Sequence, residues 1–283
     1  MKRLAKCAAA GAARPELAAL LTVAGRAALA AGAILRKLYG APHQIKHKGE
    51  IDLVTEADVA AEEAILTVLR QERPGVAILT EESPAVLQVP AAEPVWIVDP
   101  LDGTTNFAHG FPWFGVSIAY ALAKKSLVGV VYCPLQDELF CACAAHGAWL
   151  NGEPIRTSTT PALLQALVAT GFPYDIHQQP APVLAALQTI LTRAQGVRRA
   201  GAAALDLAYV ACGRLDGFWE IKLKPWDTAA GRLLVEEAGG RVSDFQGNQY
   251  WPDLPEILAS NGLIHQELTA LLKDFSLQPD YFL

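Results

Sequence analysis

The 283-residue chain lacks an excess of positive charge: 23 lysines and arginines stand against 29 acidic residues, and the net charge is −6. A protein that binds nucleic acid needs a basic surface to meet the phosphate backbone, so this balance argues against such a partner. The chain is also poor in cysteine. Its odd, scattered set favours reduced core thiols of a cytoplasmic protein over a disulfide framework. These cysteines are Cys7, Cys133, Cys141, Cys143 and Cys212.

The sequence also offers no long apolar run that is free of charge. Arg14, Pro15 and Glu16 interrupt the alanines near the N-terminus, and Arg26 divides the next apolar stretch. A membrane-spanning helix needs ~20 mostly uncharged residues. We therefore expect a soluble, cytoplasmic protein with no membrane partner. The alternative is that the short basic leader addresses the protein to an organelle.

Several motifs of enzyme chemistry are missing. The sequence contains neither a phosphate-binding loop ending in Gly-Lys-Ser/Thr nor a dinucleotide-binding Gly-x-Gly-x-x-Gly. The stretch Gly115-Val-Ser-Ile-Ala fails as a nucleophile elbow at its last position. The pair Cys141 and Cys143 with His146 is the one soft-metal candidate, but it lies on an apolar, alternating segment without a fourth ligand. Because these motifs are absent, the acidic residues are the main candidates for a functional site.

What is present is a chain that is 52% hydrophobic, with clear periodicity. Helical spacing predicts helices over residues 16–39, 57–70 and 227–238, of which the last is the last strong helix. Apolar runs predict strands over 76–79, 95–98, 114–123 and 127–133, with a turn at 124–126, and Asn151-Gly152 predicts a hairpin. The mixture favours alternating layers of helix and sheet. We expect a single domain over 1–283 with lobes of about 1–155 and 156–283, divided at 154–161.

Acidic residues follow predicted strands or open predicted helices at four places. Each has a structural explanation: a capping box after Thr55, a solvated loop, a type I turn at 99–102 and a helix N-cap. Together, however, clustered carboxylates repel one another unless a cation neutralises them. A set of oxygen ligands without histidine or cysteine selects a hard cation such as Mg²⁺. These residues are Asp58, Glu81, Glu82, Asp99, Asp102 and Asp227.

Two long motifs carry a resemblance to a known family. The segments WIVDPLDGTTNFAHGFPWFGVSIA and WDTAAGRLLVEEAGG, preceded by DLVTEAD and TEES at the expected places, closely resemble the inositol monophosphatase family. The resemblance covers residues 16–263. It implies a layered αβαβα sandwich of the sugar-phosphatase fold, usually dimeric, that hydrolyses phosphate monoesters with two or three Mg²⁺ ions and is sensitive to lithium.

The resemblance also implies roles for individual residues. Asp58 and Thr104, together with Glu81, would activate the attacking water, and Asp58 would hold an additional metal ion through water. A basic residue is expected before DLVT, and His47 and Lys48 are both candidates. The implied metal ligands are Glu81, Asp99, the carbonyl of Leu101, Asp102 and Asp227. The implied substrate contacts are Asp102, Gly103, Thr104, Thr105, Gly201, Ala203, Glu220 and Asp227.

The substrate remains more open than the chemistry. Glu220 and the small-residue loop from Gly201 favour inositol 1-phosphate. Relatives with the same core act on fructose 1,6-bisphosphate, 3′-phosphoadenosine 5′-phosphate, histidinol phosphate or NADP. A non-catalytic regulator that binds metal and phosphate is the alternative from another class, and it would be expected to have lost a ligand. Every implied ligand position is filled in this sequence.

Activity should depend on Mg²⁺, because every ligand that the resemblance implies is a hard oxygen donor. We expect EDTA to abolish phosphate release and added Mg²⁺ to restore it, as measured by inorganic phosphate. Restoration by Zn²⁺ but not by Mg²⁺ would contradict the assignment. The resemblance also implies inhibition by Li⁺ and by excess Ca²⁺, and indifference to both would weaken the link to the inositol branch.

Overall fold

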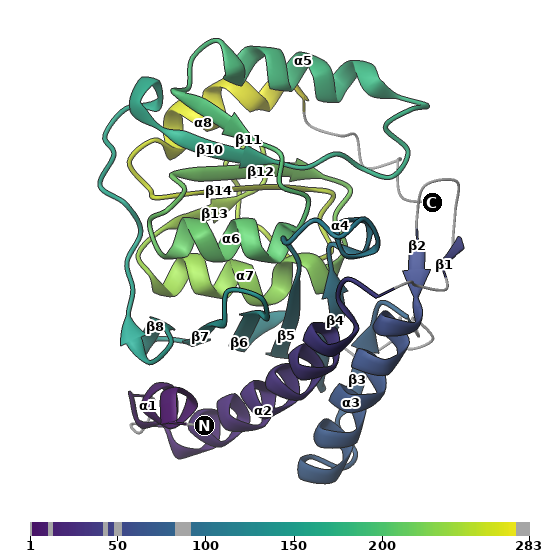
Figure 1. The fold of residues 1–283 in the computed structure, drawn as a ribbon. Helices are drawn as coiled ribbons and strands as arrows, with labels where there is room; N and C mark the ends of the chain where they lie inside the picture. Colours follow the sequence, from purple (N-terminus) through teal and green to yellow (C-terminus); the bar gives the residue numbers. More distant parts are fainter. Residues whose placement is uncertain (1, 11–13, 42–44, 48–52, 83–91, 276–283) are drawn as a thin grey trace.

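The computed structural model describes residues 2–10, 14–41, 45–47, 53–82 and 92–275. In this part of the chain, helices and sheets alternate in five layers (Figure 1). Helices α2 and α3 cover one face of a large sheet, α6 and α7 lie between the two sheets, and α5 and α8 cover the far face of the small sheet. The predicted αβαβα sandwich is confirmed. The helices are α1 (Lys2–Ala10), α2 (Pro15–Leu38), α3 (Glu56–Glu72), α4 (Thr104–Ala108), α5 (Pro180–Leu191), α6 (Ala203–Ala211), α7 (Pro225–Glu237) and α8 (His265–Leu272).

The large sheet has seven strands in the order β3-β4-β5-β6-β7-β8-β9. Among the described residues of this sheet, β3 and β4 pair in parallel and all other neighbouring strands pair antiparallel. Asn151 and Gly152 have φ of 54° and 89°, as the predicted Asn-Gly hairpin requires. The β5–β6 turn lies at Ala123 and Lys124, earlier than predicted, because both residues adopt positive φ. The strands are β3 (Ala77–Thr80), β4 (Pro94–Asp102), β5 (Gly115–Leu122), β6 (Lys125–Cys133), β7 (Glu138–Cys143), β8 (Gly147–Leu150) and β9 (Glu153–Pro154).

The small sheet has five strands in the order β11-β10-β12-β14-β13. Strand β10 pairs in parallel with both neighbours, and β14 is antiparallel to β12 and β13. The chain leaves the large sheet at Pro154 and enters the small one at Leu167. The lobes predicted on either side of 154–161 remain a prediction. The strands are β10 (Leu167–Thr170), β11 (Gly196–Arg198), β12 (Gly217–Ile221), β13 (Arg241–Ser243) and β14 (Glu256–Ser260), beside a separate pair of β1 (Ile45–His47) and β2 (Leu53–Thr55).

Helix α2 corrects one expectation. By length and composition it could cross a membrane, since its most apolar 18 residues have a mean hydropathy of 1.8. The single charge of Arg26 lowers this average too little, so the expectation that no such stretch exists is wrong. In the folded chain, 56% of that stretch is buried. Helix α2 packs against α3 and against strands β5 and β6, and its apolar face forms part of the core between helix and sheet.

Two other sequence-based boundaries differ from the structure. Helix α7 begins at Pro225, two residues before the predicted start, because proline fits the first turn of a helix. Helix α8 follows it, so α7 is not the last helix. The expected free thiols are confirmed: all five cysteines are unpaired, and four of them are buried.

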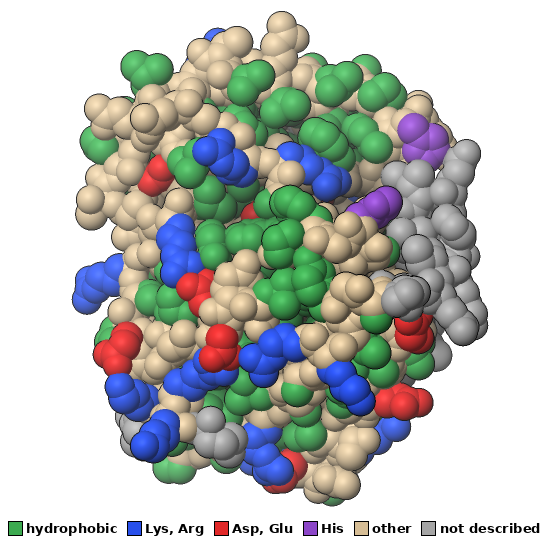
Figure 2. Space-filling view, viewed as in Figure 1, with side chains coloured by type: hydrophobic (Ala, Val, Ile, Leu, Met, Phe, Trp, Pro, Cys, Tyr) green, Lys and Arg blue, Asp and Glu red, His purple; other side chains and the backbone are tan. Residues whose placement is uncertain are grey.

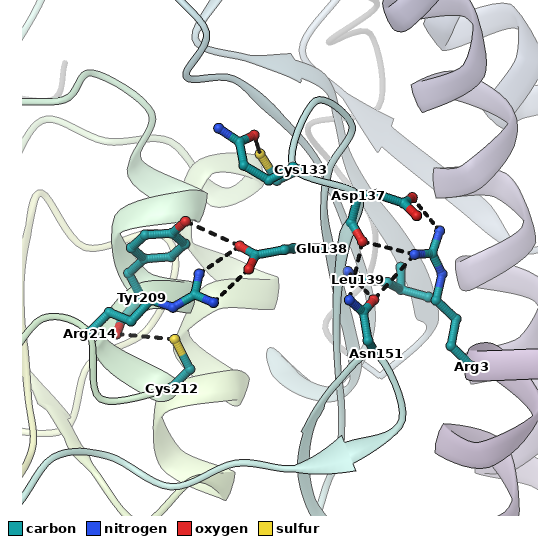
Figure 3. Close-up of polar contacts among 10 residues, drawn as sticks. Arg3, Cys133, Asp137, Glu138, Leu139, Asn151, Tyr209, Cys212 and Arg214 are labelled. Carbon is teal, nitrogen blue, oxygen red and sulfur yellow. Dashed lines mark hydrogen bonds and ion pairs between the residues drawn. The ribbon is translucent and has the colours of Figure 1, made fainter.

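Two polar clusters fasten helices to the large sheet, one on Glu138 at the start of β7 and one on Asp137 in the turn before it (Figure 3). Glu138 accepts hydrogen bonds from both terminal nitrogens of Arg214, at 2.7 and 2.6 Å, and from the Tyr209 hydroxyl at 3.1 Å. A bidentate pair of this kind fixes orientation as well as distance, so it anchors the end of α6. On the other side, Arg3 of α1 pairs with Asp137 at 2.6 Å.

The surface mixes charges of both signs. In the view of Figure 2, lysine and arginine side chains are interspersed with aspartate and glutamate, and apolar side chains lie between them. The expectation that nucleic acid is not a partner stays a prediction.

A buried histidine makes stability depend on pH. His265 is 1% exposed, and its ring nitrogens each lie 2.9 Å from a serine hydroxyl, Nδ1 from Ser260 and Nε2 from Ser243. Burial, with a contribution from the positive charge of Arg241, lowers the pKa of His265 from 6.5 to about 4. The folded chain therefore favours the neutral imidazole, and this stabilisation is complete above pH 6.5.

We expect the free energy of unfolding to fall by roughly 3 kcal/mol between pH 6.5 and pH 4 through His265 alone, because only the unfolded chain binds the proton there. Urea unfolding at several pH values measures this slope. The variant His265→Gln should have a lower free energy of unfolding than the wild type at pH 7. Its free energy of unfolding should also change less with pH between 6.5 and 4. The exposed His109, changed to Gln, is the control and should keep the wild-type slope. An unchanged slope in His265→Gln would remove His265 as the cause.

Candidate active site

An irregularity in strand β4 brings two acidic residues to one face of the sheet. Asp99 pairs with Ser117 of β5 and Asp102 with Gly115, so three steps on β4 match two steps on β5. Side chains alternate along a strand, and residues three apart would point to opposite faces without this extra residue. The predicted type I turn at 99–102 is therefore wrong: the segment is a bulged strand. The Leu101 N–H donates to Asp99 Oδ1 at 3.0 Å and fixes the bulge locally.

The chain leaves this bulge through a glycine that no other residue can replace without strain. Gly103 has φ of +95° and precedes the short helix α4. A Cβ there would lie 3.1 Å from the Trp113 carbonyl and 3.3 Å from the Gly201 carbonyl, so two backbone segments meet over Gly103. The Asn106 side chain ties the same segments together, because its Nδ2 lies 2.7 Å from the Trp113 carbonyl and 2.9 Å from that of Ala200. Asn106 was missed from sequence.

Asp58 has both a structural and a site contact. Its Oδ2 accepts from the N–H of Thr55 at 2.8 Å, which closes the predicted capping box of α3. Its Oδ1 accepts from the hydroxyl of Thr104 at 2.8 Å. The same hydroxyl lies 3.0 Å from the Leu101 carbonyl. Asp58 is fully buried and Thr104 is 5% exposed, so this pair links α3 to the end of β4 without competition from bulk water.

Asp102 interacts with the first turn of α6. Its Oδ2 accepts from the Ala204 N–H at 2.8 Å. Burial raises the pKa of Asp102 to about 7, and hydrogen bonds from the backbone of Ala203, Ala204 and Leu205 partly oppose this rise. The free N–H groups and the dipole at a helix start favour a carboxylate, and this explains the placement.

Three further acidic residues surround Asp99. Burial raises the pKa of Asp99 well above its ordinary value, and the charges of Glu81, Asp102 and Asp227 raise it further. Glu81 follows β3, and its N–H donates to the Val98 carbonyl of β4 at 3.3 Å. Asp227 lies in the first turn of α7 and accepts from the Lys224 N–H at 2.7 Å. The structure thus brings together the four carboxylates that the sequence analysis singled out as metal ligands.

The donor set suits a hard divalent cation. Asp99, Asp102 and Asp227 each direct one carboxylate oxygen to a backbone N–H, and an ionised carboxylate has several lone pairs, so a metal ion can bind beside these hydrogen bonds. Among the described residues, no three acidic, histidine or cysteine side chains already surround one point as ligands do. A cation with oxygen preference would relieve the mutual repulsion that raises the pKa of Asp99.

Two more buried carboxyls adjoin this cluster. Glu220 of β12 is 8% exposed, and burial raises its pKa well above the ordinary value, with added contributions from Asp227 and Asp206. Within the described residues, no hydrogen bond reaches the Glu220 carboxylate. Asp206 of α6 is 2% exposed, and its Oδ1 has no partner among these residues. Asp206 was missed from sequence, although it closes the GAAALD segment that begins at Gly201.

The remaining predicted residues fall around the same cluster or outside the described chain. Gly201, with φ of +89°, lies against Gly103, and Ala203 is the first residue of α6. Thr105 is exposed on α4. His47 ends β1, but the structure describes only its backbone, and Lys48 lies outside the described residues.

Comparison with known proteins finds close relatives. The model of the inositol monophosphatase family matches residues 16–276. An inositol-1-monophosphatase of Synechocystis is 47% identical over 91% of this chain and 90% of its own length. The Nus factor SuhB of Escherichia coli K12 is 43% identical over 90% and 96% of the two chains. The solved inositol monophosphatase of Anabaena superposes with a TM-score of 0.80 at 42% identity, covering 92% of this chain and 97% of that one.

These similarities and the layered sandwich, with its acidic cluster at the end of β4, define the chain as a phosphatase of phosphate monoesters. It belongs to the inositol monophosphatase family, whose members are in general metal-dependent.

The repulsion around Asp99 yields a test that does not require activity. In EDTA, Asp99→Asn should raise the melting temperature by at least about 2 °C, because it removes a buried charge among like charges and keeps the acceptor for Leu101. Added Mg²⁺ should stabilise the wild type more than the variant. The matched control is Asp137→Asn: pairing with Arg3 lowers the pKa of Asp137 to about 2, so this change should not stabilise. A lower melting temperature for Asp99→Asn in EDTA would contradict the argument.

Proposed function

We propose that the protein is a Mg²⁺-dependent phosphatase that hydrolyses inositol 1-phosphate with a metal-activated water. The observation that carries this proposal is the bulge of β4, which directs Asp99 and Asp102 to one face beside Glu81 and Asp227. These four carboxylates and the Leu101 carbonyl would hold two or three Mg²⁺ ions. The ions, when bound, supply a nucleophilic hydroxide and neutralise the phosphoryl oxygens.

Thr104 and Asp58 would handle the proton of the attacking water. The Thr104 hydroxyl lies within donating distance of Asp58 Oδ1 and of the Leu101 carbonyl. With its own hydrogen directed there, the hydroxyl oxygen is left to accept a hydrogen bond from a water on its other side. Removal of the water proton toward Thr104 and Asp58 is general base catalysis through a fixed relay.

The phosphate would lie at the start of α4. The N–H groups of Gly103, Thr104 and Thr105 belong to a helix start, where backbone donors have no partner inside the helix. Such donors favour an anion. Asp102, close by, would be one of the residues that hold a cation.

Glu220 would recognise the alcohol part of the ester, and Gly201 and Ala203 would line its space. A buried carboxylate that has no hydrogen-bond donor among the described residues suits the hydroxyl groups of a polyol, which can donate hydrogen bonds to it. Relatives named inositol-1-monophosphatase, such as that of Synechocystis, support inositol 1-phosphate as the substrate. The alternative is that the same chemistry acts on fructose 1,6-bisphosphate, 3′-phosphoadenosine 5′-phosphate, histidinol phosphate or NADP. We further infer a cytoplasmic homodimer that is sensitive to Li⁺, on the family resemblance.

The experiment that tests this function is a phosphate-release panel with Mg²⁺. The esters are inositol 1-phosphate, fructose 1,6-bisphosphate, 3′-phosphoadenosine 5′-phosphate, histidinol phosphate and NADP. We expect the highest kcat/KM for inositol 1-phosphate. A preference for another ester would keep the chemistry and change the substrate. No release from any of them would favour the non-catalytic regulator.

The relay and the metal ligands should respond differently to mutation. Thr104→Ala should lower kcat by ~10²–10⁴, the scale of a lost general base, with little change in the Mg²⁺ concentration for half-maximal activity. Asp227→Asn should lower kcat/KM by at least ~10² and also raise that Mg²⁺ concentration, because it removes one ligand charge. A Thr104→Ala defect confined to KM would make Thr104 a binding residue. Wild-type turnover in Asp227→Asn would reduce Asp227 to a helix cap.

A further inference from the structure

Gly171 lies where the carboxylate of Glu220 leaves no space for a side chain. It follows β10 directly and is buried. A Cβ built on Gly171 would overlap both carboxylate oxygens and the Cδ of Glu220, closer than any real Cβ approaches another atom. The backbone of Gly171 does not have positive φ, so its conformation is open to alanine. Space is the reason for glycine at this position.

Neither backbone is free to retreat from the other. Thr170 pairs with Trp219 in the parallel ladder between β10 and β12, which brings Gly171 and Glu220 side by side. Glu220 itself pairs with Ile257 of β14. On the other side of Gly171, the guanidinium of Arg199 stacks on the Phe172 ring at 5.1 Å. A side chain at position 171 must therefore displace the Glu220 carboxylate and not the sheet.

The Glu220 carboxylate has more acidic than basic neighbours. Asp227, Asp206 and Asp102 are acidic neighbours that act on it, and the positive charge of Arg199 opposes them. A move toward the acidic residues increases repulsion, and a move toward Arg199 takes the carboxylate out of the position that the proposed function assigns to it.

We propose that Gly171 is a positioning residue for recognition of the substrate alcohol, because its missing side chain creates the space in which the Glu220 carboxylate stands. This inference rests on the proposed function, in which Glu220 accepts hydrogen bonds from polyol hydroxyls. Gly171 itself touches no reacting atom in this scheme. Its effect passes through Glu220 and should vanish when that carboxylate is removed.

A double-mutant cycle tests the proposal with wild type, Gly171→Ala, Glu220→Ala and the double variant. For inositol 1-phosphate, Gly171→Ala should lower kcat/KM by about 10-fold or more, the scale of losing one hydrogen bond to a charged group. For 2-glycerophosphate, with fewer hydroxyls, the loss should be less than about 3-fold. In the Glu220→Ala background, the change at 171 should cost less than about 2-fold on either ester.

The same double-mutant cycle can be measured by melting temperature, which requires no enzyme activity. Gly171→Ala should lower the melting temperature when Glu220 is present. It should have little effect on the melting temperature in the Glu220→Ala background. This holds even where Gly171→Ala alone does not fold, because the double variant should then fold. The control is Gly196→Ala on β11, which lies opposite Leu167 at the other end of β10. It should leave both ester activities at the wild-type level.

The outcomes separate this inference from the proposed function. A wild type that hydrolyses neither ester would overturn the function, while the melting cycle would still report on the contact between positions 171 and 220. Losses from Gly171→Ala that are equal in both backgrounds, in kinetics or in melting temperature, would overturn the inference alone. So would a double variant that fails to fold, since Gly171 would then serve the backbone and not Glu220.

Discussion

The extra residue in strand β4 is the constraint on which the site depends. A regular strand would send Asp99 and Asp102 to opposite faces, one toward α2 and α3 and the other toward α6 and α7. With the bulge, both carboxylates lie on one side of the ladder with β5. Asp102 then meets the start of α6, and Gly103 turns the chain so that Thr104 reaches Asp58. The bulge therefore places the end of β4 in contact with α6 through Asp102, and the turn at Gly103 places Thr104 in contact with α3.

The N-termini of helices partly offset the negative charge of the acidic cluster. Four helices begin at the acidic cluster, and each presents the positive end of its dipole there. Asp58 and Asp227 lie in the first turns of α3 and α7, Thr104 opens α4, and Asp102 accepts from the first turn of α6. The ion pair of Glu138 with Arg214 secures the far end of α6 on β7. The fold therefore offsets part of the cost of burying carboxylates before any cation is involved.

In the proposed function, chemistry and recognition come from different sheets. The proposed metal ligands Glu81, Asp99 and Asp102 belong to the ends of β3 and β4 in the large sheet. Glu220 and Gly171 belong to β12 and the end of β10 in the small sheet. Asp227, on α7 between the two sheets, joins these halves. A division of this kind lets the alcohol specificity change within the small sheet while the bulge and its acidic residues stay intact.

The amino-acid sequence was enough to predict the periodic helices, the Asn151-Gly152 hairpin, the capping box of Asp58 and the family motifs, because these depend on neighbours along the chain. It placed the acidic residues at the ends of strands but read the bulge as a turn, since strand pairing with β5 decides between the two. It missed Gly171 and Asp206 for a related reason. The room that Gly171 leaves for Glu220 depends on contacts between distant strands and helices, and so does the burial of Asp206 Oδ1, which has no partner among the described residues. Only the tertiary structure sets those contacts, because burial and space are properties of the packed layers and not of any local stretch.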